Sequence, residues 1–135
     1  INVLKGVDTR EFYAPGTLFQ IELDNTQPLA YGMPERTAIR FTNSPAFRLL
    51  PYVRESKAIG YYDDVDPLLS GWLIGPDKLA GKTALADIPV EKGRVILFGF
   101  RVQSRAQTFG TFKLLFNAIC TSRTEPIETL ETITN

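Results

Sequence analysis

The residues with the clearest capacity for chemistry form a short polar stretch, residues 101–107, which contains Arg101, Gln103, Arg105 and Gln107. Guanidinium groups bind carboxylates and phosphates through paired N–H donors, and amide side chains add further donors and acceptors. Side chains two residues apart share one side of an extended backbone, so we expect Arg101, Gln103 and Arg105 to project together. The pattern therefore indicates a binding site for a small anionic ligand.

The position of this stretch favours the same interpretation. It follows an apolar run and precedes an expected helix, and helix N-termini favour anions. In open sheets with parallel strands, ligands bind beyond the carboxyl ends of the strands. A structural alternative stays open, in which the arginines pair with local carboxylates or carbonyls and fix the connection between strand and helix.

Two absences exclude most catalytic chemistry. The 135 residues include no His and a single Cys, Cys120. The usual general base and the commonest metal ligand are therefore missing, and neither an internal disulfide nor a Cys-rich zinc site can form. Hydrolase sites of the Ser-His and Cys-His types are excluded as well. We expect no catalytic residue, no metal site and no cofactor, and we expect Cys120 to be small and mostly buried.

Three further groups have both a functional and a structural interpretation. Asp63, Asp64 and Asp66 could bind a hard cation, but their spacing is not that of a calcium loop, so an exposed acidic turn is expected. Tyr61, Tyr62 and Trp72 could stack on a sugar, although packing is the more usual role of aromatic side chains. A glycosidase-like carboxylate pair is a weaker alternative, for which the candidates are Glu22, Glu35, Glu55, Asp64 and Asp77.

The overall charge is balanced, with 15 Lys and Arg against 15 Asp and Glu. This balance gives no general attraction to nucleic acid or to an anionic membrane, and no apolar run approaches the length of a membrane span. We expect neither partner. The first residue is Ile rather than Met, which suggests a processed or excised piece. Residues 1–120 are expected to form a single β-rich domain, and residues 121–135 a flexible tail.

The elements that would position the polar stretch are a hairpin and a helix. Residues 83–88 and 95–100 are expected to be strands joined by a turn, and the second is apolar throughout, as in a central strand covered on both faces. A helix is expected from about residue 108. Its apolar side chains recur at steps of three and four, which predicts one buried stripe of Phe109, Phe112, Phe116 and Ile119.

Other segments add strands but few helices. Strands are expected at residues 17–24, 37–42 and 58–62, with Phe19, Ile21 and Leu23 on one face of the first. Residues 68–74 are either a strand or a short helix, and residues 76–80 fit one helical turn. The fold class is therefore α+β or α/β, a β-rich mixed sheet with few helices.

Three segments carry a family resemblance: QPLAYGMP at residues 27–34, GWLIGPDKLAGKTAL at 71–85 and GRVILFGFRVQSRAQTFGTFKLLFNA at 93–118. Together they resemble the C-terminal accessory domain of bacterial zinc carboxypeptidase-type peptidases. Gln27 stands where the family is expected to have His. The resemblance implies a domain similar to class I glutamine amidotransferases, of which this chain would be the later, flavodoxin-like part. The nucleophile elbow, the His-Glu pair and the zinc motif of the peptidase are absent from this sequence, so no catalytic role is carried over.

The resemblance leads to two functional hypotheses. The first is a non-catalytic accessory or interaction domain of a larger zinc carboxypeptidase-like protein, with the peptidase domain as its partner. The alternative is the module for small anionic ligands built on the polar stretch. A sheet without its first strands would also expose an edge, from which we expect a homodimer. A periplasmic or secreted location would follow only from the parent protein.

Overall fold

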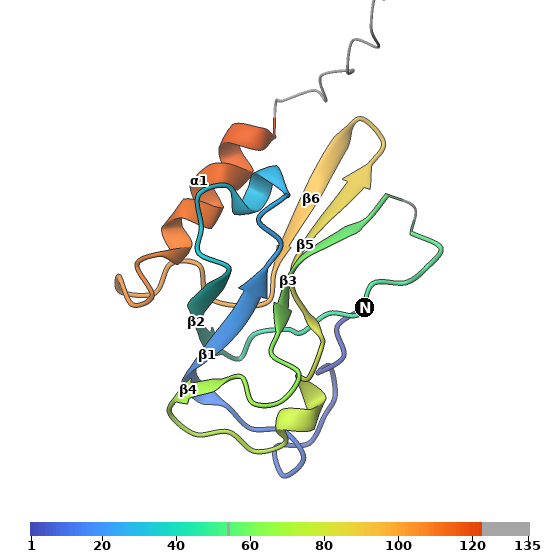
Figure 1. Cartoon of the computed structure of the whole chain (residues 1–135). Helices are drawn as coiled ribbons and strands as arrows, with labels where there is room; N and C mark the ends of the chain where they lie inside the picture. The colour runs from blue at the N-terminus through green and yellow to red at the C-terminus, as the bar shows by residue number, and fades with distance from the viewer. Residues whose placement is uncertain (54, 123–135) are drawn as a thin grey trace, which may run out of the picture.

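The computed structural model describes residues 1–53 and 55–122, which fold into one sheet with a single α-helix (Figure 1). Most of the expected tail, residues 121–135, lies outside the described residues. The elements are β1 (Pro15–Leu23), η1 (Pro28–Ala30), β2 (Arg36–Thr42), β3 (Lys57–Tyr62), β4 (Leu68–Ser70), η2 (Pro76–Lys78), β5 (Thr83–Val90), β6 (Gly93–Phe98) and α1 (Thr111–Thr121).

The six strands form a curled, half-barrel sheet in the order β2-β1-β3-β5-β6, with β4 paired to β1. Every pairing among the described strands is antiparallel. The expected β-rich domain with few helices is confirmed, and its class is α+β. The argument about ligands at the carboxyl ends of parallel strands therefore does not apply, since no parallel pair of the flavodoxin-like kind occurs among these strands.

The alternation of β1 is confirmed by its burial, because Phe19, Ile21 and Leu23 are all buried while the residues between them are partly exposed. Phe41 of β2 packs against Phe19 with ring centroids 5.3 Å apart. Tyr62 of β3 meets Phe19 edge to face at 6.2 Å. These three rings pack against one another in the hydrophobic core.

The expectation of a central strand at residues 95–100 is wrong. β6 is the last strand of the sheet, with β5 as its neighbour, and residues 93–95 are exposed while 96–98 are partly buried. β5, which has β3 and β6 as neighbours, is the more buried strand of the hairpin, since its first five residues are buried. An uninterrupted apolar run predicts a strand that is covered on both faces, but the sequence alone gives neither the strand order nor the elements that cover each face.

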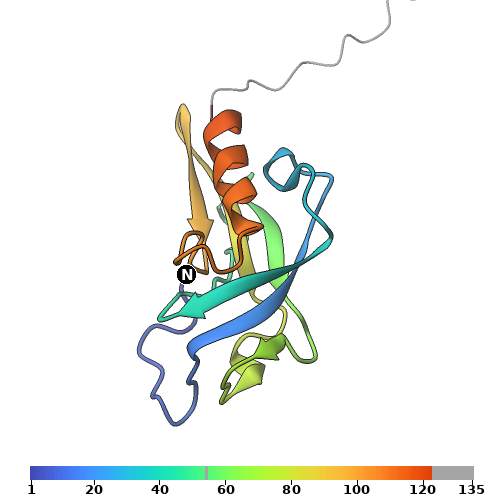
Figure 2. The same ribbon diagram turned by 90° about the vertical axis from the view of Figure 1, so that its left-hand side faces the viewer.

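The helix begins at Thr111, and its buried side is not the predicted one. Thr111 and Leu114 are buried, whereas Phe109, Phe116 and Ile119 are 72%, 63% and 60% exposed. Residues suited to burial recur at steps of three and four on two sides of this helix. The side with the smaller residues, Thr111 and Leu114, faces the core. In Figure 2, α1 stands between β6 and the β1–β2 side of the sheet, so it covers the open side of the half-barrel.

The loop between β3 and β4 agrees with the expectation from the sequence. Residues 63–66 form the expected acidic turn, in which the Asp63 carboxylate accepts hydrogen bonds from the N–H groups of Val65 and Asp66. These bonds hold the pKa of Asp63 below its usual value.

Within the described residues, no cluster of three or more His, Cys, Asp or Glu could hold a metal ion. None of the described helices has the length and apolar character needed to cross a membrane.

Candidate functional site

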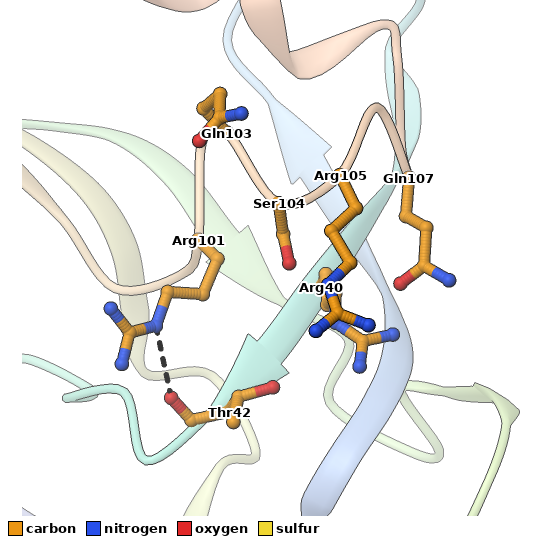
Figure 3. Close-up of a pocket in the computed structure, with 7 residues that line it drawn as sticks. All are labelled: Arg40, Thr42, Arg101, Gln103, Ser104, Arg105 and Gln107. Carbon is orange, nitrogen blue, oxygen red and sulfur yellow. Dashed lines mark hydrogen bonds between the residues drawn. The ribbon is translucent and has the colours of Figure 1, made fainter.

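Arg101, Gln103, Arg105 and Gln107 all line one open cavity of about 420 Å³ (Figure 3). The sequence therefore identified side chains that lie close together in space. The cavity is completed by residues that the sequence analysis did not single out: Arg40, Thr42 and Ser104. We call this set of seven residues the arginine pocket. Arg40 and Thr42 belong to β2, about sixty residues earlier in the chain, and no local signal connects them with residues 101–107.

The backbone reaches this arrangement in a different way from the one expected. The stretch does not stay extended, because Ser104 and Gln107 close a tight turn through a 2.8 Å hydrogen bond from the Gln107 N–H to the Ser104 carbonyl. Within this turn Arg105 and Ala106 have φ angles of 51° and 56°. The left-handed region costs about 1–2 kcal/mol for a residue with a side chain, so the segment that carries Arg105 is strained.

Arg101 attaches the polar stretch, residues 101–107, to β2. Its N–H donates a 2.9 Å hydrogen bond to the Arg40 carbonyl, and its Nε donates to the Thr42 carbonyl at 3.3 Å. The second bond is of the kind that the structural alternative predicted. Arg101 therefore fixes the segment in place, and this part of its role is independent of any ligand.

The other two arginines are not used in this way. No described residue forms an ion pair or a hydrogen bond with the guanidinium group of Arg40 or Arg105, and both groups line the arginine pocket. Gly16 leaves the space for Arg40, because a Cβ there would lie 3.0 Å from an Arg40 Nη atom. Thr42 Oγ1 is buried without a hydrogen-bond partner among the described residues. Guanidinium groups that share a cavity without a carboxylate repel one another, and a bound anion would offset that repulsion.

A second surface lies beside the first. An open groove of about 660 Å³ runs between the N-terminal half of α1, the start of β2 and the loop before β2. The sequence analysis missed this groove because Phe109, Phe112 and Phe116, which line it, were expected to be buried. The residues that line the apolar groove are Gly32, Met33, Pro34, Arg36, Thr37, Ala38, Thr108, Phe109, Gly110, Phe112, Lys113 and Phe116.

The remaining candidates fall outside both surfaces. Cys120 is exposed, so the expectation of a small, mostly buried side chain is wrong. Tyr62 is buried, which is the packing role expected for aromatic residues, and it cannot share an exposed platform with Tyr61 and Trp72. Of the carboxylate candidates, Glu22 pairs with Arg36 at 2.9 Å on the exposed side of the sheet.

No known protein family, curated protein or solved structure matches this chain. The resemblance to the accessory domain of zinc carboxypeptidases therefore stays a prediction from the sequence, and the functional argument depends on the geometry of the arginine pocket and the apolar groove.

Proposed function

We propose that this chain is a non-catalytic interaction domain that binds a partner protein through the phenylalanines of α1, Phe109 just before it, and the apolar groove beside them. The resemblance carried by residues 27–34, 71–85 and 93–118 makes the peptidase domain of a zinc carboxypeptidase-like protein the expected partner. The observation that carries the proposal is the exposure of Phe109 and Phe116, at 72% and 63%, next to a groove lined largely by apolar side chains.

Exposed apolar side chains that form a contiguous patch favour contact with another protein. Burying one phenylalanine side chain stabilises a complex by about 1.5–3 kcal/mol before the costs of association. Isolated surface phenylalanines need no explanation, but Phe109 and Phe112 have ring centroids 5.3 Å apart, and both line the groove with Phe116. The three rings thus line one groove, and two of them are in contact.

The opposite side of α1 is firmly attached, so the phenylalanines are presented on a fixed support. Leu114 is fully buried, and the Thr111 hydroxyl lies 2.7 Å from the Val102 carbonyl oxygen. Asn117 donates from Nδ2 to the carbonyls of Leu29 and Tyr31, each at 3.0 Å. A surface that is already ordered loses little entropy on binding, which supports a role in recognition.

Photo-crosslinking tests the proposal. A p-benzoylphenylalanine at position 116, introduced into the protein in the cells that make it, is expected to crosslink to a zinc peptidase domain. The same group at position 52 is the control, since Tyr52 is 77% exposed in the loop between β2 and β3. Equal crosslinking from both positions, or a product formed with a second copy of this chain, would contradict the proposal.

A second candidate function, binding of a small anion, is favoured by the arginine pocket. Arg40, Arg101 and Arg105 line it, and no Asp or Glu is among its described lining residues. The two functions are compatible, because the arginine pocket and the apolar groove use different parts of β2. The homodimer through an open sheet edge also stays a prediction.

A further inference from the structure

We infer that the partner enters as an extended, acidic segment, which adds a strand to the free edge of β2. Its apolar side chains would occupy the apolar groove, and a carboxylate near its end would occupy the arginine pocket. This inference rests on the proposed interaction function, and it specifies the binding mode and the chemistry of the partner.

The hydrogen bonding of β2 shows which of its backbone groups are free. The Leu23 N–H donates to the Glu35 carbonyl at 2.7 Å, and the register pairs Ile21 with Thr37 and Phe19 with Ile39. In an antiparallel ladder the backbone groups of alternate residues point to opposite neighbours. The odd-numbered residues of β2 therefore face β1, and the backbone groups of Arg36, Ala38 and Arg40 face away from it.

One of these outward groups already has a partner, which confirms the direction. The Arg40 carbonyl accepts a hydrogen bond from the Arg101 N–H at 2.9 Å, in an antiparallel bridge between the two residues. No described residue occupies the outward backbone positions of Arg36 and Ala38, and both residues are exposed. The edge is therefore open along its first half and ends at the polar segment that carries the arginine pocket.

The apolar groove lies along this open half. Arg36, Thr37 and Ala38 form its β2 wall, and the facing wall is formed by the phenylalanines at positions 109, 112 and 116, in α1 and just before it. Successive side chains of a paired strand point to opposite sides, so every second side chain of an added segment would point into the groove. A strand edge next to an apolar groove is the arrangement used for recognition by strand addition, in which the backbone gives affinity and the side-chain pockets give specificity.

The charges of the two surfaces select the chemistry of the segment. Lys113 lines the groove, three arginines line the arginine pocket, and neither cavity has a described Asp or Glu among its lining residues. Arg36 is partly neutralised by its exposed ion pair with Glu22. The strongest uncompensated positive charge lies at Arg40 and Arg105, so a carboxylate is expected at the end of the segment that reaches beyond residue 40.

Ala38 allows a direct test of the strand pairing. Replacing Ala38 by Pro removes one outward N–H, and proline is tolerated on edge strands where the N–H faces solvent. Ala38→Val is the matched control, because it keeps the N–H and has high β-propensity. Random peptides displayed on phage would be selected on the unmodified chain, and the resulting consensus peptide would be synthesised as the probe.

The expected consensus has alternating apolar residues followed by Asp or Glu. Calorimetry with this peptide is expected to give an affinity about tenfold or more weaker for Ala38→Pro than for Ala38→Val, and about tenfold or more weaker for Arg105→Gln than for the unmodified chain. Equal affinity for Ala38→Pro and Ala38→Val, or a consensus without acidic residues, would overturn the inference. Should Ala38→Pro fail to fold, hydrogen exchange decides: the amides of Arg36 and Ala38 must become protected when the peptide binds.

The outcome separates this inference from the proposed function. Binding that is lost in Phe116→Gln but kept in Ala38→Pro would leave the interaction function standing and eliminate strand addition. Formation of a homodimer that Ala38→Pro abolishes would assign the edge to a second copy of the chain and overturn the inference. No selected peptide, together with no crosslink from position 116, would remove both.

Discussion

The hydroxyl group of Tyr62 donates a 2.6 Å hydrogen bond to the carbonyl oxygen of Gly99, and both residues are buried. Tyr62 ends β3, while Gly99 and Phe100 connect β6 to the polar segment. Burial raises the pKa of Tyr62, because the charged phenolate would lose its hydration. This single contact thus connects the core to the start of the segment that carries the arginine pocket.

The buried phenol predicts a loss of stability at alkaline pH. Above about pH 10 the unfolded chain releases the Tyr62 proton while the folded chain keeps it, so the free energy of unfolding falls as the pH rises further. Below that pH both states hold the proton and the contribution is constant. Urea unfolding of Tyr62→Phe is expected to show a weaker decline above about pH 10 than the unmodified chain.

Tyr62→Phe also carries a cost at neutral pH. The Gly99 carbonyl would lose its buried donor, so the free energy of unfolding is expected to fall by about 1–3 kcal/mol. Tyr52→Phe is the control, since Tyr52 is exposed and its change should be within about 0.5 kcal/mol. A similar alkaline decline in both variants would contradict the assignment to Tyr62.

Thr111 is predicted to hold the polar segment against α1. Its hydroxyl is fully buried and lies 2.7 Å from the Val102 carbonyl oxygen and 2.8 Å from that of Thr108. Thr111→Val keeps the shape and removes the donor, so urea unfolding is expected to show a loss of about 1–3 kcal/mol. Thr111→Ser keeps the donor and should lose less; the reverse order would contradict a role for the hydroxyl.

The sequence predicted the strands well because their signals are local. The alternation of β1 depends on residues two apart, and the turn at residues 63–66 depends on Asp63 and its neighbours, so both were correct. The place of β6 at the end of the sheet, and the side of α1 that faces the core, both depend on how the strands are arranged. That order is set by contacts between distant residues, and no short window of sequence contains them.

The arginine pocket was predicted in part for the same reason. Arg101 to Gln107 stood out because they are adjacent polar residues after an apolar run, whereas Arg40 joins them through the pairing of β2 with Arg101. The apolar groove was missed since periodicity identifies an apolar stripe without saying what covers it. An excess of apolar positions around α1, more than one core-facing side can use, is the signal that could have indicated it.

Cys120 is predicted to react in the folded protein. Its side chain is exposed near the end of α1, so Ellman's reagent should modify it without denaturant, at a rate that urea raises only slightly. Cys120→Ser should leave the free energy of unfolding unchanged within about 0.5 kcal/mol. A thiol that reacts only after unfolding would show that this part of α1 is covered.

Arg105 and Arg101 are predicted to differ in a way that separates ligand binding from structure. The Arg105 guanidinium has no hydrogen bond to a described residue, so Arg105→Ala should change the free energy of unfolding by no more than about 0.5 kcal/mol. Arg101→Ala loses the bond from Nε to the Thr42 carbonyl and should cost about 1 kcal/mol. Urea unfolding followed by circular dichroism measures both changes.

Inorganic phosphate, titrated by calorimetry at low salt, then reports on the arginine pocket. Arg101→Ala and Arg105→Ala should each weaken phosphate binding about tenfold, because each removes one charged donor from the cavity. Arg48→Ala is the control: it removes an exposed arginine outside the cavity and should have no effect. Acetate should compete if a carboxylate is accepted. A loss of stability in both arginine variants with no phosphate binding in the unmodified chain would mean that the arginines are purely structural. The strained turn at Arg105 would then have no ligand to explain it, whereas binding lost in a fully stable Arg105→Ala would identify that turn as the part of the chain that holds a cation over the pocket.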